Sequence, residues 1–156
     1  MPSTRWLPAL SILVVFVGCS SNDSMVRPVV ACDFAAKLKS RAGAGAMDCG
    51  HAALGGSASA VDACVVQAFQ AGQAFYARYD RQGIDSAVVF GIAGDSSGNV
   101  IFMLRDSDPS GGSGAPPTLY ENSCLDPAVD PSTSRDPFIA PPLTCTSSPS
   151  LGQTCS

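Results

Sequence analysis

The sequence predicts an α+β domain in which one main amphipathic helix packs on a three- or four-stranded antiparallel meander. The first observation is a stripe of apolar residues between Ser59 and Gly72 with the i, i+3, i+4, i+7 spacing of a helix face. The second is a change to a period of two after Gly72, which is typical of strands. The third is a set of cysteines that flank this segment and can staple it with disulfides. The helical stripe comprises Val61, Cys64, Val65, Ala68 and Phe69.

Capping residues define the ends of the expected helices. Ser59, with Asp62 three residues later, is placed to cap the first turn of the main helix, and Gly72 is placed to end it. A shorter helix is expected between Asp33 and Arg41, where three basic residues favour the carboxyl-terminal end of the helix dipole. The segment between the two helices, including His51, is expected to be a linker.

Four strands are expected after the main helix. Phe75–Tyr79 forms the first, residues 80–83 form a turn, and the second presents one face made of Ile84, Ser86, Val88, Phe90 and Ile92. Val100–Arg105 forms the third, and Thr118–Cys124 is a fourth strand that returns along the sheet. From Asp126 onward prolines are frequent and apolar periodicity is lost, so residues 126–156 are expected to be an irregular tail tied down by disulfides.

The third strand is apolar on both faces. Phe102 points one way while Ile101 and Met103 point the other, and one helix cannot cover both sides of a sheet. The far face is therefore covered by the proline-rich tail, covered by a partner, or left open for binding. The residues of this candidate binding face are Ala87, Val89, Ile101 and Met103.

Residues 1–18 have the anatomy of a secretory signal: Arg5, then an apolar run from Leu7 to Val17 that is shorter than the roughly 20 residues of a membrane-spanning helix. At its end, Phe16-Val17-Gly18-Cys19 resembles the lipobox of bacterial lipoproteins, apart from Phe16, where that family usually carries leucine or another aliphatic residue. The resemblance implies that Cys19 is acylated and becomes the first mature residue. An ordinary cleaved signal with a stray cysteine is the alternative.

The cysteine count agrees with this reading. The chain has seven cysteines, an odd number, and lipid on Cys19 leaves six for disulfides in an oxidising compartment. We expect the pairs Cys49 with Cys64 and Cys124 with Cys145, because each closes a short segment beside the core, and Cys32 with Cys155 by elimination. No Cys-x-x-Cys pair exists and there is one histidine, so neither a metal site nor a cofactor is expected.

Removing residues 1–18 from the 156 leaves 138, enough for one domain. We divide the mature chain into a tether at 19–30, a domain at 31–125 and the tail at 126–156. Eight basic and thirteen acidic residues remain, a net charge of −5. This composition argues against nucleic acid and against a polybasic membrane contact. Attachment to the membrane would rest on the acyl chains, at about 0.8 kcal/mol per buried methylene.

Candidate chemistry in the sequence is sparse. His51 could serve as the base of a small hydrolase, but no Gly-x-Ser-x-Gly elbow accompanies it. Asp106 and Asp108, followed by Gly111, weakly resemble an acidic calcium loop without the ligand spacing of an EF-hand. Cys49 and Cys64 lack the setting that activates a thiol, and a disulfide is the simpler expectation.

The mature pattern resembles small cysteine-rich lipoproteins that are frequent in myxobacteria. The resemblance rests on Ala31-Cys32-Asp33, Asp48-Cys49-Gly50, Ala63-Cys64-Val65, Asp85-Ser86-Ala87-Val88 and Asn122-Ser123-Cys124. It implies a lipid-anchored protein of the cell envelope, and Ser20 after the lipidated cysteine favours the outer membrane, on its periplasmic or surface side. We expect a non-enzymatic module that binds an envelope protein or a small apolar ligand. A hydrolase using His51 and a purely structural envelope spacer are the alternatives.

Overall fold

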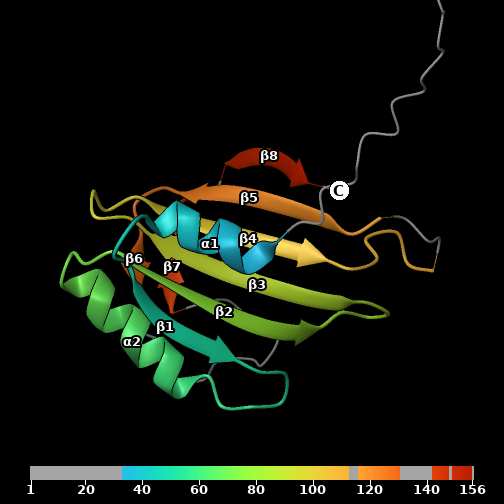
Figure 1. Ribbon diagram of the computed structural model, residues 1–156, viewed down its shortest axis with the longest axis horizontal. Coiled ribbons are helices and arrows are strands. Elements are labelled where there is room, and N and C mark those ends of the chain that lie inside the picture. Colours follow the sequence, from blue (N-terminus) through green and yellow to red (C-terminus); the bar gives the residue numbers. More distant parts are fainter. Residues whose placement is uncertain (1–32, 113–115, 131–141, 148, 156) are drawn as a thin grey trace, which may run out of the picture.

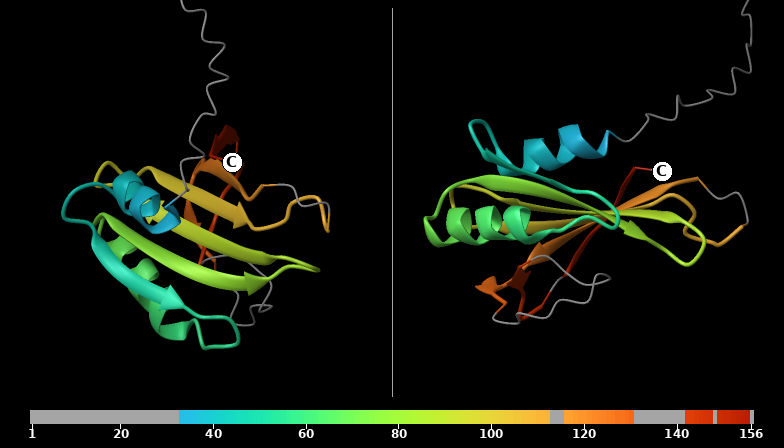
Figure 2. Two further views of the ribbon diagram at one scale, coloured as in Figure 1. Left: turned by 45° about the vertical axis from the view of Figure 1, so that its right-hand side comes forward. Right: turned by 90° about the horizontal axis from the view of Figure 1, so that it is seen from below.

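A six-stranded mixed sheet with one helix on each face forms the described part of the chain (Figure 1). The computed structural model describes residues 33–112, 116–130, 142–147 and 149–155, with the backbone alone at 152–155. The strand order is β1-β2-β3-β4-β5-β8, and a separate two-stranded pair, β6 with β7, lies beside α2 on the same side of the sheet (Figure 2). The strands are β1 (Met47–Ala52), β2 (Phe75–Gln82), β3 (Ala87–Gly94), β4 (Val100–Asp106), β5 (Thr118–Cys124), β6 (Ala128–Val129), β7 (Leu143–Thr144) and β8 (Ser150–Cys155).

The α+β prediction is confirmed, but the sheet is larger than predicted and is not wholly antiparallel. The expected meander is present as β2 to β5, whose neighbours pair antiparallel. At one edge β1 runs parallel to β2, with the helix α2 (Ser59–Gln70) as the crossover between them. At the other edge β8 pairs antiparallel with β5, although it comes from the tail that we expected to be irregular.

The helix α2 matches the predicted main helix, but its first turn is capped differently. Ala58 is the N-cap, its backbone is already helical, and it makes no side-chain capping bond. The Ser57 hydroxyl instead accepts a hydrogen bond from the Ser59 N–H at 3.3 Å. Asp62 accepts a hydrogen bond from the Tyr79 hydroxyl at 3.0 Å, so this carboxylate joins α2 to β2.

The helix α1 (Phe34–Ala42) is the expected short helix. Asp33 is its N-cap, and the Asp33 carboxylate accepts the Ala36 N–H at 3.0 Å. The helix crosses the sheet above Gly91, where an added Cβ would lie 2.8 Å from both Leu38 Cδ1 and Phe34 Cζ. A residue without a side chain at this point of β3 therefore lets the helix approach the sheet closely.

The sheet divides the apolar interior into two cores. The α2-side core contains Cys49, Ala52, Val61, Val65, Ala68, Phe75, Ala77, Tyr79, Ile92, Val100, Cys124 and Leu143. The α1-side core contains Phe34, Leu38, Ala42, Val89, Ala93, Met103 and Leu119. Phe102 packs against the first and Met103 belongs to the second, as expected for a strand that is apolar on both faces.

The turn between β2 and β3 lies later than predicted. Strand β2 continues to Gln82, and the chain reverses after Gly83, whose N–H donates to the Ser86 carbonyl at 2.9 Å. Ile84 is fully exposed in this turn and is not part of a strand. Ile84 lies an even number of residues before Val88 and Phe90, so it matched the predicted strand face although it precedes the strand.

Candidate functional site

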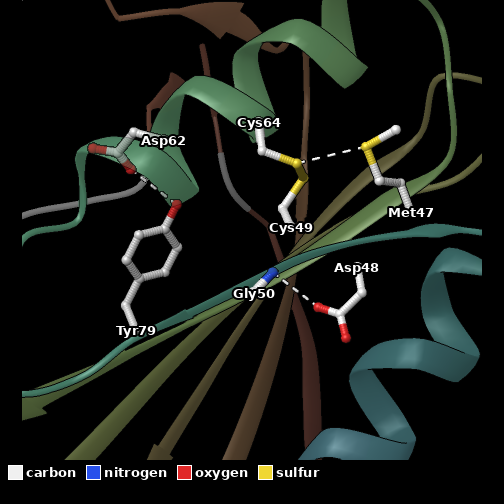
Figure 3. The surroundings of a disulfide bond; sticks show 7 residues. All are labelled: Met47, Asp48, Cys49, Gly50, Asp62, Cys64 and Tyr79. Carbon is white, nitrogen blue, oxygen red and sulfur yellow. Dashed lines mark hydrogen bonds between the residues drawn. A yellow bond between two sulfur atoms is a disulfide. The ribbon is translucent and has the colours of Figure 1, made fainter.

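Both disulfides that we expected beside the core are present. Cys49 of β1 bonds to Cys64 of α2 with 5.4 Å between the Cα atoms, and Cys124 of β5 bonds to Cys145 with 5.2 Å. Figure 3 shows the first of these, with the Met47 sulfur 3.5 Å from the Cys64 sulfur. Cys19 and Cys32 lie outside the described residues, as does the side chain of Cys155, so lipidation and the third pair stay predictions.

The face that we named as a candidate binding surface is occupied by α1. Met103 is wholly buried and Val89 is nearly so, both within the α1-side core. Ile101 is half-buried against the same core, and Ala87 is exposed at the end of β3. Neither Val89 nor Met103 presents a surface to a partner. The cover is the amino-terminal helix, and not the proline-rich tail that we had considered.

A buried carboxylate fastens α1 to the sheet. Glu121 on β5 has no exposed side-chain surface, and its two oxygens face two cations of the helix. Lys37 Nζ lies 3.2 Å from one oxygen and Arg41 Nη2 lies 2.6 Å from the other, while 31% of the Lys37 side chain and 41% of the Arg41 side chain remain exposed. The helix is therefore held by apolar contacts through Phe34 and Leu38 and by an ion-pair clamp along one flank.

Beside α1, on the same face, a polar cluster joins β1 to β2. Asp80 accepts a hydrogen bond from Arg78 Nε at 2.9 Å and faces Arg78 Nη2 at 2.8 Å. The second Asp80 oxygen lies 2.8 Å from His51 Nε2. The parallel pairing of β1 with β2 sets His51 opposite Arg78 and brings the imidazole within reach of the carboxylate. These three side chains, His51, Arg78 and Asp80, form what we call the histidine cluster.

A second contact between the same strands adjoins the histidine cluster. Asp48 of β1 is paired in register with Tyr76 of β2, and Figure 3 shows the Asp48 side chain on the side of β1 that faces α1. Desolvation raises the pKa of the Tyr76 phenol, and the hydrogen bond to Asp48 and the negative charge of that carboxylate raise it further. The phenol therefore stays protonated above the pH at which a free tyrosine ionises.

The opposite face carries a row of large side chains that α2 leaves partly open. Tyr79, Phe90, Leu104 and Tyr120 are cross-strand neighbours on β2, β3, β4 and β5. Tyr79 is buried, but Leu104 and Tyr120 keep 36% and 37% of their surface exposed. The Phe90 ring lies 5.5 Å from that of Phe102, and the Arg81 guanidinium stands 5.6 Å above Phe90. We call Phe90, Phe102, Leu104 and Tyr120 the aromatic ledge.

The acidic segment that weakly resembled a calcium loop forms a hydrogen-bonded turn. Asp106 accepts the Asp108 N–H at 3.0 Å, and Asp108 accepts the Gly112 N–H at 2.6 Å. Within the described ranges, no group of three or more histidine, cysteine, aspartate or glutamate side chains is arranged to hold a metal ion. These carboxylates satisfy backbone donors of their own loop.

Comparison with protein-family models, with curated proteins and with solved structures gave no significant match. Among the described residues, no helix is both long and apolar enough to cross a membrane. The candidate sites are therefore weighed on their own geometry.

Sequence reasoning singled out His51 but missed the residues around it. Asp80 was assigned to a turn and Arg78 to a strand without a role, because the pairing that joins them to His51 depends on a strand that we read as a linker. Glu121 was also missed, although it is the chain's sole glutamate and shares a strand face with the apolar Leu119. A charged residue at such an inward position signals a buried ion pair.

Proposed function

We propose that this protein is a lipid-anchored component of the cell envelope that acts as a non-enzymatic binding module. The observation that carries the proposal is the pair of disulfides, Cys49 with Cys64 and Cys124 with Cys145. Disulfides persist in oxidising compartments outside the cytoplasm. Together with the signal-like residues 1–18 and the lipobox resemblance at Cys19, they support export followed by acylation.

The aromatic ledge is the binding surface that this proposal uses. It lies on a regular sheet, and its exposed members, Leu104 and Tyr120, are neighbours across β4 and β5. Aromatic and large aliphatic side chains supply contact area at low conformational cost, which suits a small apolar ligand. The ordered strands beneath hold them in place before a ligand arrives.

Lipidation is tested with labelled palmitate in a bacterial host that processes lipoproteins. We expect the wild-type protein to incorporate the label and the Cys19→Ser variant to lose it, because the thiol of Cys19 is the acceptor. Replacement of another exported cysteine pair, Cys49 and Cys64 by alanine, should leave labelling intact. Equal labelling of the wild type and the Cys19→Ser variant would end the lipoprotein proposal.

Binding at the aromatic ledge is tested with the apolar dye anilinonaphthalenesulfonate. The double replacement Leu104→Ser and Tyr120→Ser should reduce dye binding severalfold while changing the melting temperature little, since both side chains are more than one-third exposed. The control is Leu54→Ser, which removes a leucine with 57% exposure away from the ledge. If Leu54→Ser reduces dye binding as much as the double variant, the ledge is not the binding surface.

A hydrolase is the second candidate, and the contact between His51 and Asp80 favours it. A neutral imidazole that donates from Nε2 to the carboxylate keeps Nδ1 as an acceptor, which could draw a proton from a water molecule. Arg78 would then orient an anionic substrate beside it. The alternative is a purely structural role, in which a surface ion-pair network joins the edge strand β1 to β2. All three side chains are more than a quarter exposed, as in such surface networks.

His51→Gln separates these two readings. An exposed ion pair contributes about 0–1 kcal/mol to the free energy of unfolding, so the variant should keep nearly the wild-type melting temperature. The hydrolase candidate requires the wild type to release nitrophenol from nitrophenyl acetate or nitrophenyl phosphate, and the variant to have lost that activity. If the wild type and His51→Gln behave alike on both esters, the hydrolase candidate is rejected.

A further inference from the structure

The fold separates charge in a way that composition alone does not reveal. Five of the six lysine and arginine residues in the described part of the chain lie on α1 or on the sheet face that α1 covers, and four carboxylates accompany them. The remainder of the described chain carries one cation and seven carboxylates. The α1 side holds Lys37, Lys39, Arg41, Arg78, Arg105, Asp33, Asp48, Asp80 and Glu121; elsewhere are Arg81, Asp62, Asp85, Asp95, Asp106, Asp108, Asp126 and Asp130.

Two of these placements follow from strand geometry. Arg105 follows Met103 by two residues on β4 and so shares its face, which belongs to the α1-side core. Arg81 stands over the Phe90 ring and therefore lies on the α2 side. The α1 side is thus slightly basic, with five cations against four carboxylates, although the mature net charge is −5.

The proposed lipid anchor would hold the domain within reach of a membrane. The first described residue is Asp33, the N-cap of α1, and 13 residues separate it from Cys19. A chain of that length spans at most about 50 Å at full extension, comparable with the diameter of a domain of this size. Helix α1 is therefore the element bound most closely, along the chain, to the lipidated cysteine.

We infer that the α1 side is a docking surface for an anionic lipid bilayer, which orients the anchored domain with α1 toward the membrane and the aromatic ledge away from it. The inference rests on the proposed anchor, which supplies the affinity; the charges supply the orientation. Each basic residue close to an anionic membrane surface raises the binding constant for that surface about fivefold. In the opposite orientation Arg81 is the one cation of the described residues on the side that faces the lipid, so no comparable attraction acts there.

The test uses the full lipidated protein in two kinds of vesicle, phosphatidylcholine alone and phosphatidylcholine mixed with phosphatidylglycerol. A fluorescent amino acid replaces either Ser40 on α1 or Gln70 on α2, both of which are exposed, and a headgroup-attached quencher reports their distance from the lipid. We expect stronger quenching at Ser40 than at Gln70 on the anionic vesicles. The difference should vanish on phosphatidylcholine and at high salt.

Two matched variants isolate the role of charge. Lys39→Gln and Gln67→Glu each lower the net charge by one at an exposed helical position, the first on α1 and the second on α2. Lys39 is chosen because Lys37 and Arg41 also hold the buried Glu121. On anionic vesicles, Lys39→Gln should lower the ratio of molecules with α1 toward the membrane to those with α2 toward it about fivefold. Gln67→Glu should leave the ratio unchanged or raise it.

The outcomes separate this inference from the proposed anchor. If the protein does not float with either kind of vesicle, the anchor is wrong and the inference falls with it. If the protein floats with both but quenching at Ser40 and Gln70 is equal on anionic lipid, the anchor stands and the docking surface is rejected. Stronger quenching at Gln70, or a preference for Ser40 that persists without anionic lipid, also overturns the electrostatic orientation.

Discussion

Replacing Lys37 and Arg41 together by methionine should lower the free energy of unfolding by about 3–5 kcal/mol, the range found when a buried charge loses its partners. Glu121 has no exposed side-chain surface, so water cannot substitute for the two lost cations. Methionine retains most of the apolar stem of both side chains, which keeps the change in packing small. The loss is measured by chemical denaturation of the oxidised protein, with far-ultraviolet circular dichroism as the signal.

Two control variants test whether that loss of stability comes from the unpaired charge of Glu121. Lys39→Met changes a neighbouring cation that is exposed and makes no ion pair with Glu121, so its effect should stay within about 0.5 kcal/mol. Adding Glu121→Leu to the double variant removes the stranded charge and should restore most of the stability, because the site adjoins the apolar α1-side core. A double variant as stable as Lys39→Met would show that Glu121 is not held by these cations.

On the α1 side of the molecule, the sequence predicted the separate elements but not the contact between them. Apolar residues on both faces of β4 correctly indicated that two covers were needed, and the pattern after Asp33 correctly predicted a helix. What joins the two is a long-range contact, because Phe34 and Leu38 meet the sheet above Gly91 more than 50 residues later. The small residues Gly91 and Ala93 on one face of β3 were the available signal that a helix packs there.

The edge strands escaped prediction for a different reason. Strand β1 buries only Cys49 and Ala52, and its pairing with β2 shifts register between Asp48 and His51. A strand with two buried positions and an irregular register has no alternating pattern to recognise. The histidine cluster depends on this strand, so its geometry could not be predicted although His51 itself was named. Strand β8 contains Gly152 and polar residues, and it forms because β5 offers it a free edge.

Removing the disulfide between Cys49 and Cys64 is expected to have the other large effect. The bond closes a segment with a sequence separation of 15, which corresponds to about 3 kcal/mol in the chain-entropy model. Replacing both cysteines by alanine should lower the free energy of unfolding by that amount, measured by denaturant titration under oxidising conditions. Both are replaced because a single substitution would leave a thiol free to exchange with the remaining disulfide.

The second disulfide provides a comparison that tests where the stabilisation resides. Cys124 with Cys145 has a similar separation, 21 residues, so the entropy term is again about 3 kcal/mol. However, the first disulfide joins β1 of the main sheet to the helix α2, whereas Cys145 of the second follows the two-residue strand β7. Loss of the second bond should therefore expose the amides of β6 and β7 to hydrogen exchange selectively, while loss of the first should accelerate exchange across β1, α2 and β2. Uniform acceleration in both variants would mean that the two bonds stabilise one cooperative unit and that β6 and β7 do not open separately.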